Sequence, residues 1–132
     1  MKAVRCLITP LAVALALTAG TASAEAPAKR VVLTNPDSGR AVEVSLGDDI
    51  EVRLERYYEK SRTYTWDAPQ TSDAAVLTRT KGAVTADGSA TAVFRAKNQG
   101  VATISVTRKC RPDDGHICPL IIVPWKAKIK VK

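Results

Sequence analysis

The stretch R-A-V-E-V-S-L, residues 40–46, followed by D-I-E-V-R-L-E-R, residues 49–56, decides the fold of this chain. Apolar residues alternate with polar ones in both segments, and those expected to face inward are Val42, Val44, Leu46, Ile50, Val52 and Leu54. Period two over consecutive segments is typical of strands with one buried face. Gly47-Asp48 separates the two segments as a turn, so we expect them to form a β-hairpin.

The same alternation recurs along the rest of the chain. The further strands it predicts are residues 63–67, 74–80, 89–96, 100–108 and 121–132. Turn formers separate these strands, and no segment after residue 24 keeps the 3.6-residue period of a helix. Many short strands with turns between them indicate a sandwich or a barrel. We therefore predict an all-β, Ig-like antiparallel β-sandwich of seven or eight strands over residues 40–132, with Trp66 in its core.

The N-terminus has the pattern of an export signal. Lys2 and Arg5 precede an almost purely apolar run, residues 7–19, and Ala22-Ser23-Ala24 supplies the small residues that signal peptidase requires. We predict that residues 1–24 are a signal peptide and that the protein is secreted or held in the cell envelope. Residues 25–39 are expected to be a loose leader with a short strand near Val31, and no transmembrane segment is expected after signal removal.

The chain has three cysteines, of which Cys6 lies in the predicted signal. The other two, Cys110 and Cys118, are close in sequence, and export to an oxidising space favours a disulfide between them. Two free thiols are the alternative.

Composition argues against catalysis and metal binding. The only histidine, His116, lies between Cys110 and Cys118, and no nucleophile, zinc-protease or phosphate-loop motif is present. The spacing of these residues matches no common zinc pattern. We predict no enzyme activity, no metal and no cofactor.

The net charge of +7 raises the question of an anionic partner. Four lysines project from one side of the last predicted strand: Lys126, Lys128, Lys130 and Lys132. They could bind an anionic cell-wall polymer, or they could form a solvated face that discourages edge-to-edge pairing. Few exposed aromatic residues accompany these charges, which disfavours nucleic acid.

Three predicted loops are the remaining candidates for a binding site: residues 56–62, 80–88 and 109–120. In a sandwich whose alternate connections cross at one end, these loops would cluster on one rim, as binding loops do. A disulfide in the third loop would lower the entropy lost on binding a cleft, or would only stabilise a small secreted domain.

Several blocks of this sequence resemble the chagasin-like family of secreted cysteine-protease inhibitors. They are V-E-V-S-L-G-D-D-I-E-V-R-L (42–54), T-Y-T-W (63–66), A-D-G-S-A-T-A-V-F-R-A (86–96), G-V-A-T-I-S-V-T (100–107) and Arg111-Pro112. The resemblance implies an Ig-like sandwich that blocks papain-like proteases with three loops at one end. The partner-binding residues it implies are Tyr57, Tyr58, Ser61, Arg62, Gly82, Asp87, Gly88, Arg111 and Pro112.

The sequence thus predicts a secreted, monomeric, non-catalytic binding protein that occludes a papain-like cysteine protease cleft. The alternative is a structural or adhesive bacterial Ig-like module of the cell surface or cell wall that uses the basic strand face.

Overall fold

The computed structural model describes residues 28–132, and the predicted signal peptide lies outside them. The elements are β1 (Arg30–Leu33), the 3-10 helix η1 (Asn35–Asp37), β2 (Ala41–Val44), β3 (Asp49–Leu54), β4 (Tyr57–Glu59), β5 (Arg62–Trp66), β6 (Gln70–Thr71), β7 (Leu77–Val84), β8 (Ala90–Ala96), β9 (Gly100–Val106), β10 (Arg108–Pro112) and β11 (Trp125–Val131). Across this part of the chain, no helix is long and apolar enough to cross a membrane.

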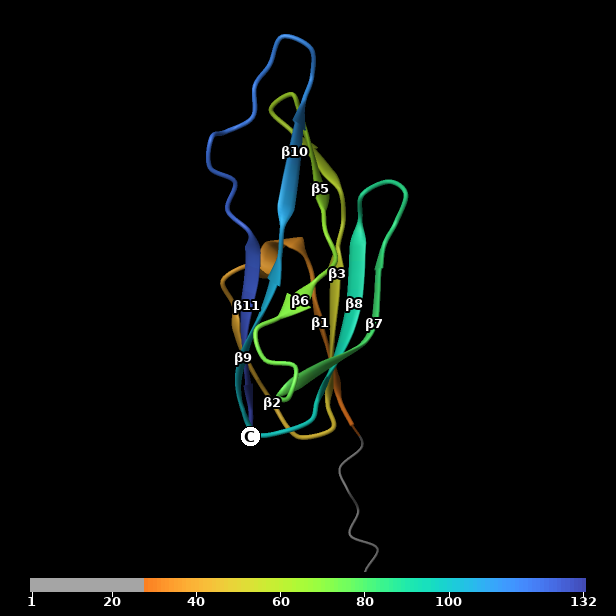
Figure 1. Cartoon of the computed structure of the whole chain (residues 1–132), viewed down its shortest axis with the longest axis vertical. Helices are drawn as coiled ribbons and strands as arrows, with labels where there is room; N and C mark the ends of the chain where they lie inside the picture. Colours follow the sequence, from red (N-terminus) through yellow and green to blue (C-terminus); the bar gives the residue numbers. More distant parts are fainter. Residues whose placement is uncertain (1–27) are drawn as a thin grey trace, which may run out of the picture.

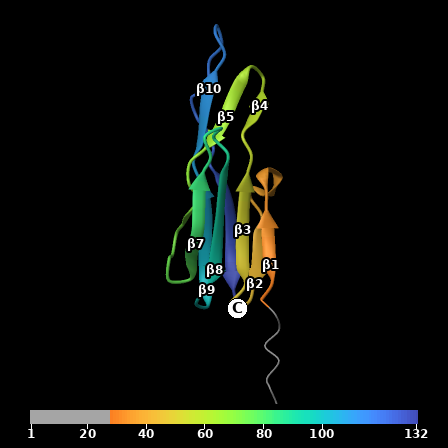
Figure 2. The same ribbon diagram turned by 90° about the vertical axis from the view of Figure 1, so that its right-hand side faces the viewer.

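Two four-stranded sheets form the body of the molecule. Their strand orders are β1-β3-β8-β7 and β2-β11-β9-β6, and they lie face to face (Figures 1 and 2). A third sheet, β10-β5-β4, extends beyond one end of the body. The predicted all-β sandwich is confirmed, with the addition that β1 pairs with β3, and β2 with β11, in parallel.

The core lies between the two large sheets and follows the alternation in the sequence. Every second residue of β11, beginning with Trp125, is buried, and the residues between them are exposed. The largest buried side chains include Trp125, Phe94, Leu33, Ile50, Leu54, Leu77, Ile104 and Ile129. Complete burial of an apolar side chain of this size contributes roughly 2 kcal/mol before the entropic cost of folding. The short strand expected near Val31 is present as β1, and its Leu33 belongs to this core.

The predicted hairpin of residues 40–56 is wrong. β2 pairs with β11 in one sheet, whereas β3 pairs with β1 and β8 in the other. The Gly47-Asp48 turn is therefore an arch between the sheets, and Leu46, just beyond the end of β2, is half exposed. The buried carboxylate of Asp48 accepts the backbone N–H groups of Ser45 at 2.9 Å and of Lys29 at 3.0 Å.

These two hydrogen bonds make Asp48 a source of acid sensitivity. The Ser45 amide, followed by the Lys29 amide, holds the pKa of this carboxyl below its ordinary 3.8. A lowered pKa in the folded state stabilises the protein above the ordinary value, and this contribution is lost as the pH falls through the folded value. We expect Asp48→Asn to cost about 2 kcal/mol of unfolding free energy at neutral pH.

Urea unfolding at a series of pH values checks this prediction. The difference between the wild type and Asp48→Asn should shrink as the pH falls below 3.8, because protonation removes what the substitution removes. A difference that stays constant with pH would contradict the role given to the carboxylate.

Other strand boundaries differ from the predicted ones, mainly in segments whose side chains do not alternate between buried and exposed. β10 occupies residues expected to be a loop, because its side chains are exposed or only half buried. β7 continues to Val84, well into the predicted 80–88 loop, and it also carries mostly exposed residues. The last strand begins at Trp125 rather than at Ile121.

Candidate functional site

Three connections lie toward the end of the sandwich from which the third sheet projects, and the tip between β7 and β8 is set lower and to one side of the other two (Figure 1). They are the turn between β4 and β5, the tip between β7 and β8, and the long connection from β10 to β11. We call them the first, second and third loop. Lys60 and Ser61 in the first loop have φ values of 51° and 59°, the left-handed conformation of a tight two-residue hairpin turn.

The first and third loops are bonded directly to each other. The Asp113 amide donates to the Ser61 carbonyl at 2.9 Å, and Arg62 Nε donates to the Ile117 carbonyl at 2.8 Å. The Tyr58 hydroxyl also donates to the Asp113 carboxylate. This acceptor stabilises the protonated phenol and raises the pKa of Tyr58 above its ordinary value. The two loops therefore form one connected tip.

A disulfide closes the third loop. Cys110 in β10 is bonded to Cys118, with Cα atoms 6.1 Å apart, which confirms the predicted pair. In the chain-entropy model, such a short closed loop adds roughly 2.5 kcal/mol of stability.

The second loop is attached to the third sheet through β5. The Trp66 amide donates to the Gly88 carbonyl at 2.8 Å, and the Arg56 amide donates to Ser89 Oγ at 3.0 Å. The Asp87 carboxylate accepts the Thr85 hydroxyl and the Ser89 amide, and these bonds hold the pKa of Asp87 below its ordinary value. All three loops are thus joined through the β4–β5 hairpin.

Most of the predicted binding residues lie at this end. Asp87, Gly88 and Arg111 line one hollow of about 370 Å³ between the second loop and β5. Tyr58 is 62% exposed on β4, while Ser61, Arg62 and Pro112 lie in and beside the first loop. These residues lie in or next to the three loops at this end of the sandwich.

Two predicted residues lie elsewhere. Gly82 is inside β7, paired with Ala92 and away from the tip of its hairpin. The Tyr57 ring stacks on Tyr64 with centroids 4.7 Å apart, and its hydroxyl accepts a hydrogen bond from Arg108 at 2.7 Å. Tyr57 thus faces a side cavity rather than the rim.

Sequence reasoning missed an exposed aliphatic run in the third loop. Its most exposed members are Ile117, Leu120, Ile121 and Val123, between 64% and 104% exposed. The signal was the continuous L-I-I-V after Cys118-Pro119, which we interpreted as the start of the last strand. Contiguous exposed apolar side chains often mark an interaction surface.

The lysines of β11 are exposed as expected, but they lie on an inner strand of the sheet and two of them pair with a glutamate. Lys126, Lys128, Lys130 and Lys132 are exposed, and Glu43 on β2 forms ion pairs with Lys130 at 3.8 Å and Lys132 at 2.9 Å. β11 lies between β2 and β9, so these lysines do not protect a sheet edge. Within residues 28–132, no group of three or more His, Cys, Asp or Glu side chains is placed to hold a metal ion.

Comparison with known proteins places this architecture among all-β sandwiches that include a protease inhibitor. No family model matches the chain, and no curated protein sequence matches it. The cysteine protease inhibitor EhICP2 from Entamoeba histolytica has a similar structure, with a TM-score of 0.54 and 13% identity over 80% of this chain and 98% of that one. The solution structure of amebosin is also similar, with a TM-score of 0.50 and 12% identity over 78% of this chain and 98% of that one.

At these identities the likeness establishes a shared fold. It agrees with the fold that the chagasin-like resemblance implied, and the near-complete coverage of both neighbours means that this chain contains their whole architecture.

Proposed function

We propose that this protein is an exported, non-catalytic inhibitor whose three loops occlude the cleft of a papain-like cysteine protease. The observation that carries the proposal is the joining of three loops into one rim at the end of a sandwich that a cysteine protease inhibitor shares. The sequence resemblance to chagasin-like inhibitors supports the same function.

Rigidity of the rim favours this function. A cleft-blocking surface binds tightly when little conformational entropy is lost on association. Asp113 and Arg62 bind the first and third loops together, Trp66 holds the second loop, and the Cys110–Cys118 bond closes the third. These contacts limit the conformational freedom that the three loops would lose on binding a partner.

The surface chemistry of the rim suits a protein partner. The aliphatic run beginning at Ile117 supplies apolar area, and Arg111 and Tyr58 are exposed beside it. Arginine, tyrosine and large apolar side chains are the residues that most often dominate protein interfaces. The disulfide is consistent with the export that residues 1–24 predict, since such bonds persist in oxidising compartments.

Inhibition of a papain-like protease by residues 25–132 tests the proposal. We expect one-to-one inhibition, measured against active-site-titrated enzyme with a fluorogenic substrate. Arg111→Ala should raise the inhibition constant at least about tenfold, because it removes an exposed charged side chain from the hollow beside the second loop. Lys128→Ala is the matched control: it removes a cation from exposed β11, away from the rim, and should change nothing.

The same inhibition assay also tests the contribution of the disulfide. Cys110→Ser combined with Cys118→Ser should also weaken inhibition about tenfold or more, because the third loop then loses entropy on binding. Circular dichroism of each variant separates loss of inhibition from loss of fold. Absence of inhibition by the folded wild type at micromolar concentration would refute the proposal for this enzyme class.

A second candidate rests on the lysine face of β11. Lys126 and Lys128 project beside Lys130 and Lys132, so an anionic cell-wall polymer is the partner this surface fits. Retention on such a polymer at moderate salt, lost in Lys126→Ala with Lys128→Ala and kept in Arg111→Ala, would support an adhesive module instead of the inhibitor.

A further inference from the structure

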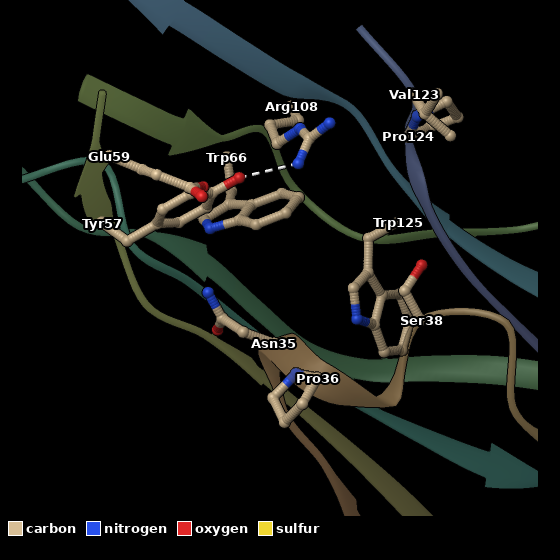
Figure 3. Close-up of a pocket in the computed structure, with 10 residues that line it drawn as sticks. All are labelled: Asn35, Pro36, Ser38, Tyr57, Glu59, Trp66, Arg108, Val123, Pro124 and Trp125. Carbon is tan, nitrogen blue, oxygen red and sulfur yellow. Dashed lines mark hydrogen bonds between the residues drawn. The ribbon is translucent and has the colours of Figure 1, made fainter. Parts of the chain in front are cut away.

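A cavity of about 510 Å³ lies on the other face of the third sheet from the hollow that Arg111 lines. Its lining residues are Asn35, Pro36, Ser38, Tyr57, Glu59, Trp66, Arg108, Val123, Pro124 and Trp125 (Figure 3). Successive residues of a strand point to opposite faces, so Arg108 and Arg111 of β10 project to different sides. The cavity therefore lies on the other side of the sheet from the hollow that Arg111 lines, and it shares only Val123 with the exposed aliphatic run of the third loop. Its volume is in the range of small-molecule sites.

The cation in this cavity is held by aromatic groups rather than by a carboxylate. One terminal nitrogen of Arg108 donates to the Tyr57 hydroxyl at 2.7 Å, and the guanidinium carbon lies 5.1 Å from the centre of the Tyr64 ring. Arg108 Nε is buried and has no hydrogen-bond partner. None of the ion pairs within residues 28–132 includes Arg108.

A partly buried guanidinium without a counter-ion is an unusual arrangement. Arginine stays charged at all accessible pH values, and burying a charge costs free energy unless an opposite charge or several hydrogen bonds compensate it. Stacking on Tyr64 and the bond to Tyr57 orient the group but leave donors of its planar fork free. A carboxylate is the anion that this fork binds in bidentate fashion.

The walls of the cavity define the rest of the ligand. Pro36, Val123 and Pro124 supply apolar contact, and Val123 is 64% exposed. Trp66 and Trp125 also line the cavity, but each is almost completely buried and adds only a small accessible area. The other polar groups are mostly engaged: Asn35 bonds the backbone of Glu55 through both its side-chain oxygen and nitrogen, and Ser38 Oγ accepts the Lys126 amide. Glu59 is exposed at the side of Tyr57 and forms no ion pair with Arg108 among the described residues.

We infer that this cavity binds a carboxylate carried on an apolar or aromatic body, with the carboxylate on Arg108 and the body against Pro36, Val123 and Pro124. Such a group occurs both in small free acids and at the carboxyl end of a peptide. The shared chemistry is a carboxylate next to an apolar group that fits the apolar part of the cavity.

Tryptophan fluorescence provides a direct test, because the chain contains two tryptophans and both line the cavity. The probes are 3-phenylpropanoate and the dipeptide N-acetyl-leucyl-phenylalanine, each compared with its carboxamide. Phenyl groups do not absorb at the red edge of the tryptophan band, so the signal comes from the protein alone. We expect a saturable emission change with each acid and at least about tenfold weaker binding of the matching amide.

Arg108→Gln should weaken binding of both acids about tenfold or more, whereas Arg111→Ala, on the other face, should leave it unchanged. If Arg108→Gln does not fold, the comparison of acid with amide on the wild type still decides. Tighter binding of the dipeptide acid would assign the site to peptide ends, and tighter binding of phenylpropanoate to free acids. Equal response to acid and amide, or no saturable response at millimolar concentration, would overturn the inference, whatever the outcome of the protease assay.

Discussion

Replacement of Trp66 by alanine is expected to lower the free energy of unfolding by about 4 kcal/mol, in the range measured for large aromatic residues in protein cores. Trp66 is only 4% exposed and belongs to the main core cluster. Its indole nitrogen donates to the Glu55 carbonyl at 2.9 Å, so the substitution leaves both a void and a part-buried carbonyl without its partner. Since a domain of this size is stable by only about 5–15 kcal/mol, the loss is large.

Urea unfolding followed by circular dichroism measures this effect. Trp66→Phe is the matched control, because it keeps an aromatic ring in the core while it removes the bond to Glu55 and a smaller part of the volume. We expect it to cost about 1–2 kcal/mol. Near-equal costs for the two variants would show that the hydrogen bond, and not packing, accounts for the stability. A cost below about 1 kcal/mol for Trp66→Ala would show that the indole is not part of the core.

The second large effect is expected at Gly88 in the second loop. Gly88 has φ of +90°, and a Cβ placed there would lie 2.6 Å from Thr65 Cβ. The left-handed conformation costs a non-glycine residue roughly 1–2 kcal/mol, and overpacking against a β-branched side chain in a strand adds about 1–3 kcal/mol. Gly88→Ala should therefore cost about 3 kcal/mol in total and move the second loop away from β5.

Gly39→Ala separates these two causes. Gly39 has φ of +87°, and a Cβ placed there would have no other atom within 4 Å, so this position carries the conformational cost alone. We expect a loss of about 1 kcal/mol there, measured by the same urea unfolding. Equal losses at the two glycines would remove Thr65 from the explanation. If the proposed inhibition needs the second loop in place, Gly88→Ala should weaken it and Gly39→Ala should not.

The strands with one buried face were predictable from sequence. In β8, β9 and β11 the residues expected to face inward, such as Phe94, Ile104 and Ile129, are fully buried, although Val93 and Val101 interrupt the alternation of apolar and polar residues. Alternation reports burial on one face, and burial in a two-layer sandwich depends on little else.

Alternation did not predict which strands pair with each other. Alternation in residues 40–46 and 49–56 is the same whether the two segments pair with each other or lie in opposite sheets. The choice depends on β11, whose Ile129 is in register with Val42 from the far end of the chain. The bond of Asp48 to Lys29, which helps to close the arch, is likewise tertiary and leaves no local pattern.

The site was predictable at the level of loops and less so at the level of side chains. The Cys110–Cys118 pair was predictable from the closeness of the two cysteines in sequence and from the predicted export signal. Tyr57 was grouped with Tyr58 because the two are adjacent, yet strand alternation sends them to opposite faces, and Arg108, which fixes Tyr57, is distant in sequence. The cavity beside it is formed by segments from η1 to β11 and has no sequence motif.

The interior position of β11 also constrains the order of assembly. Its sheet has β2 and β9 on either side, so residues 125–131 must be present before β2 has any partner in that sheet. A chain that emerges from its N-terminus, from a ribosome or through a membrane channel, keeps β2 unpaired until its final strand is free. Folding dominated by such distant pairings is slow, so this sheet is completed only after the residues of β11 are available.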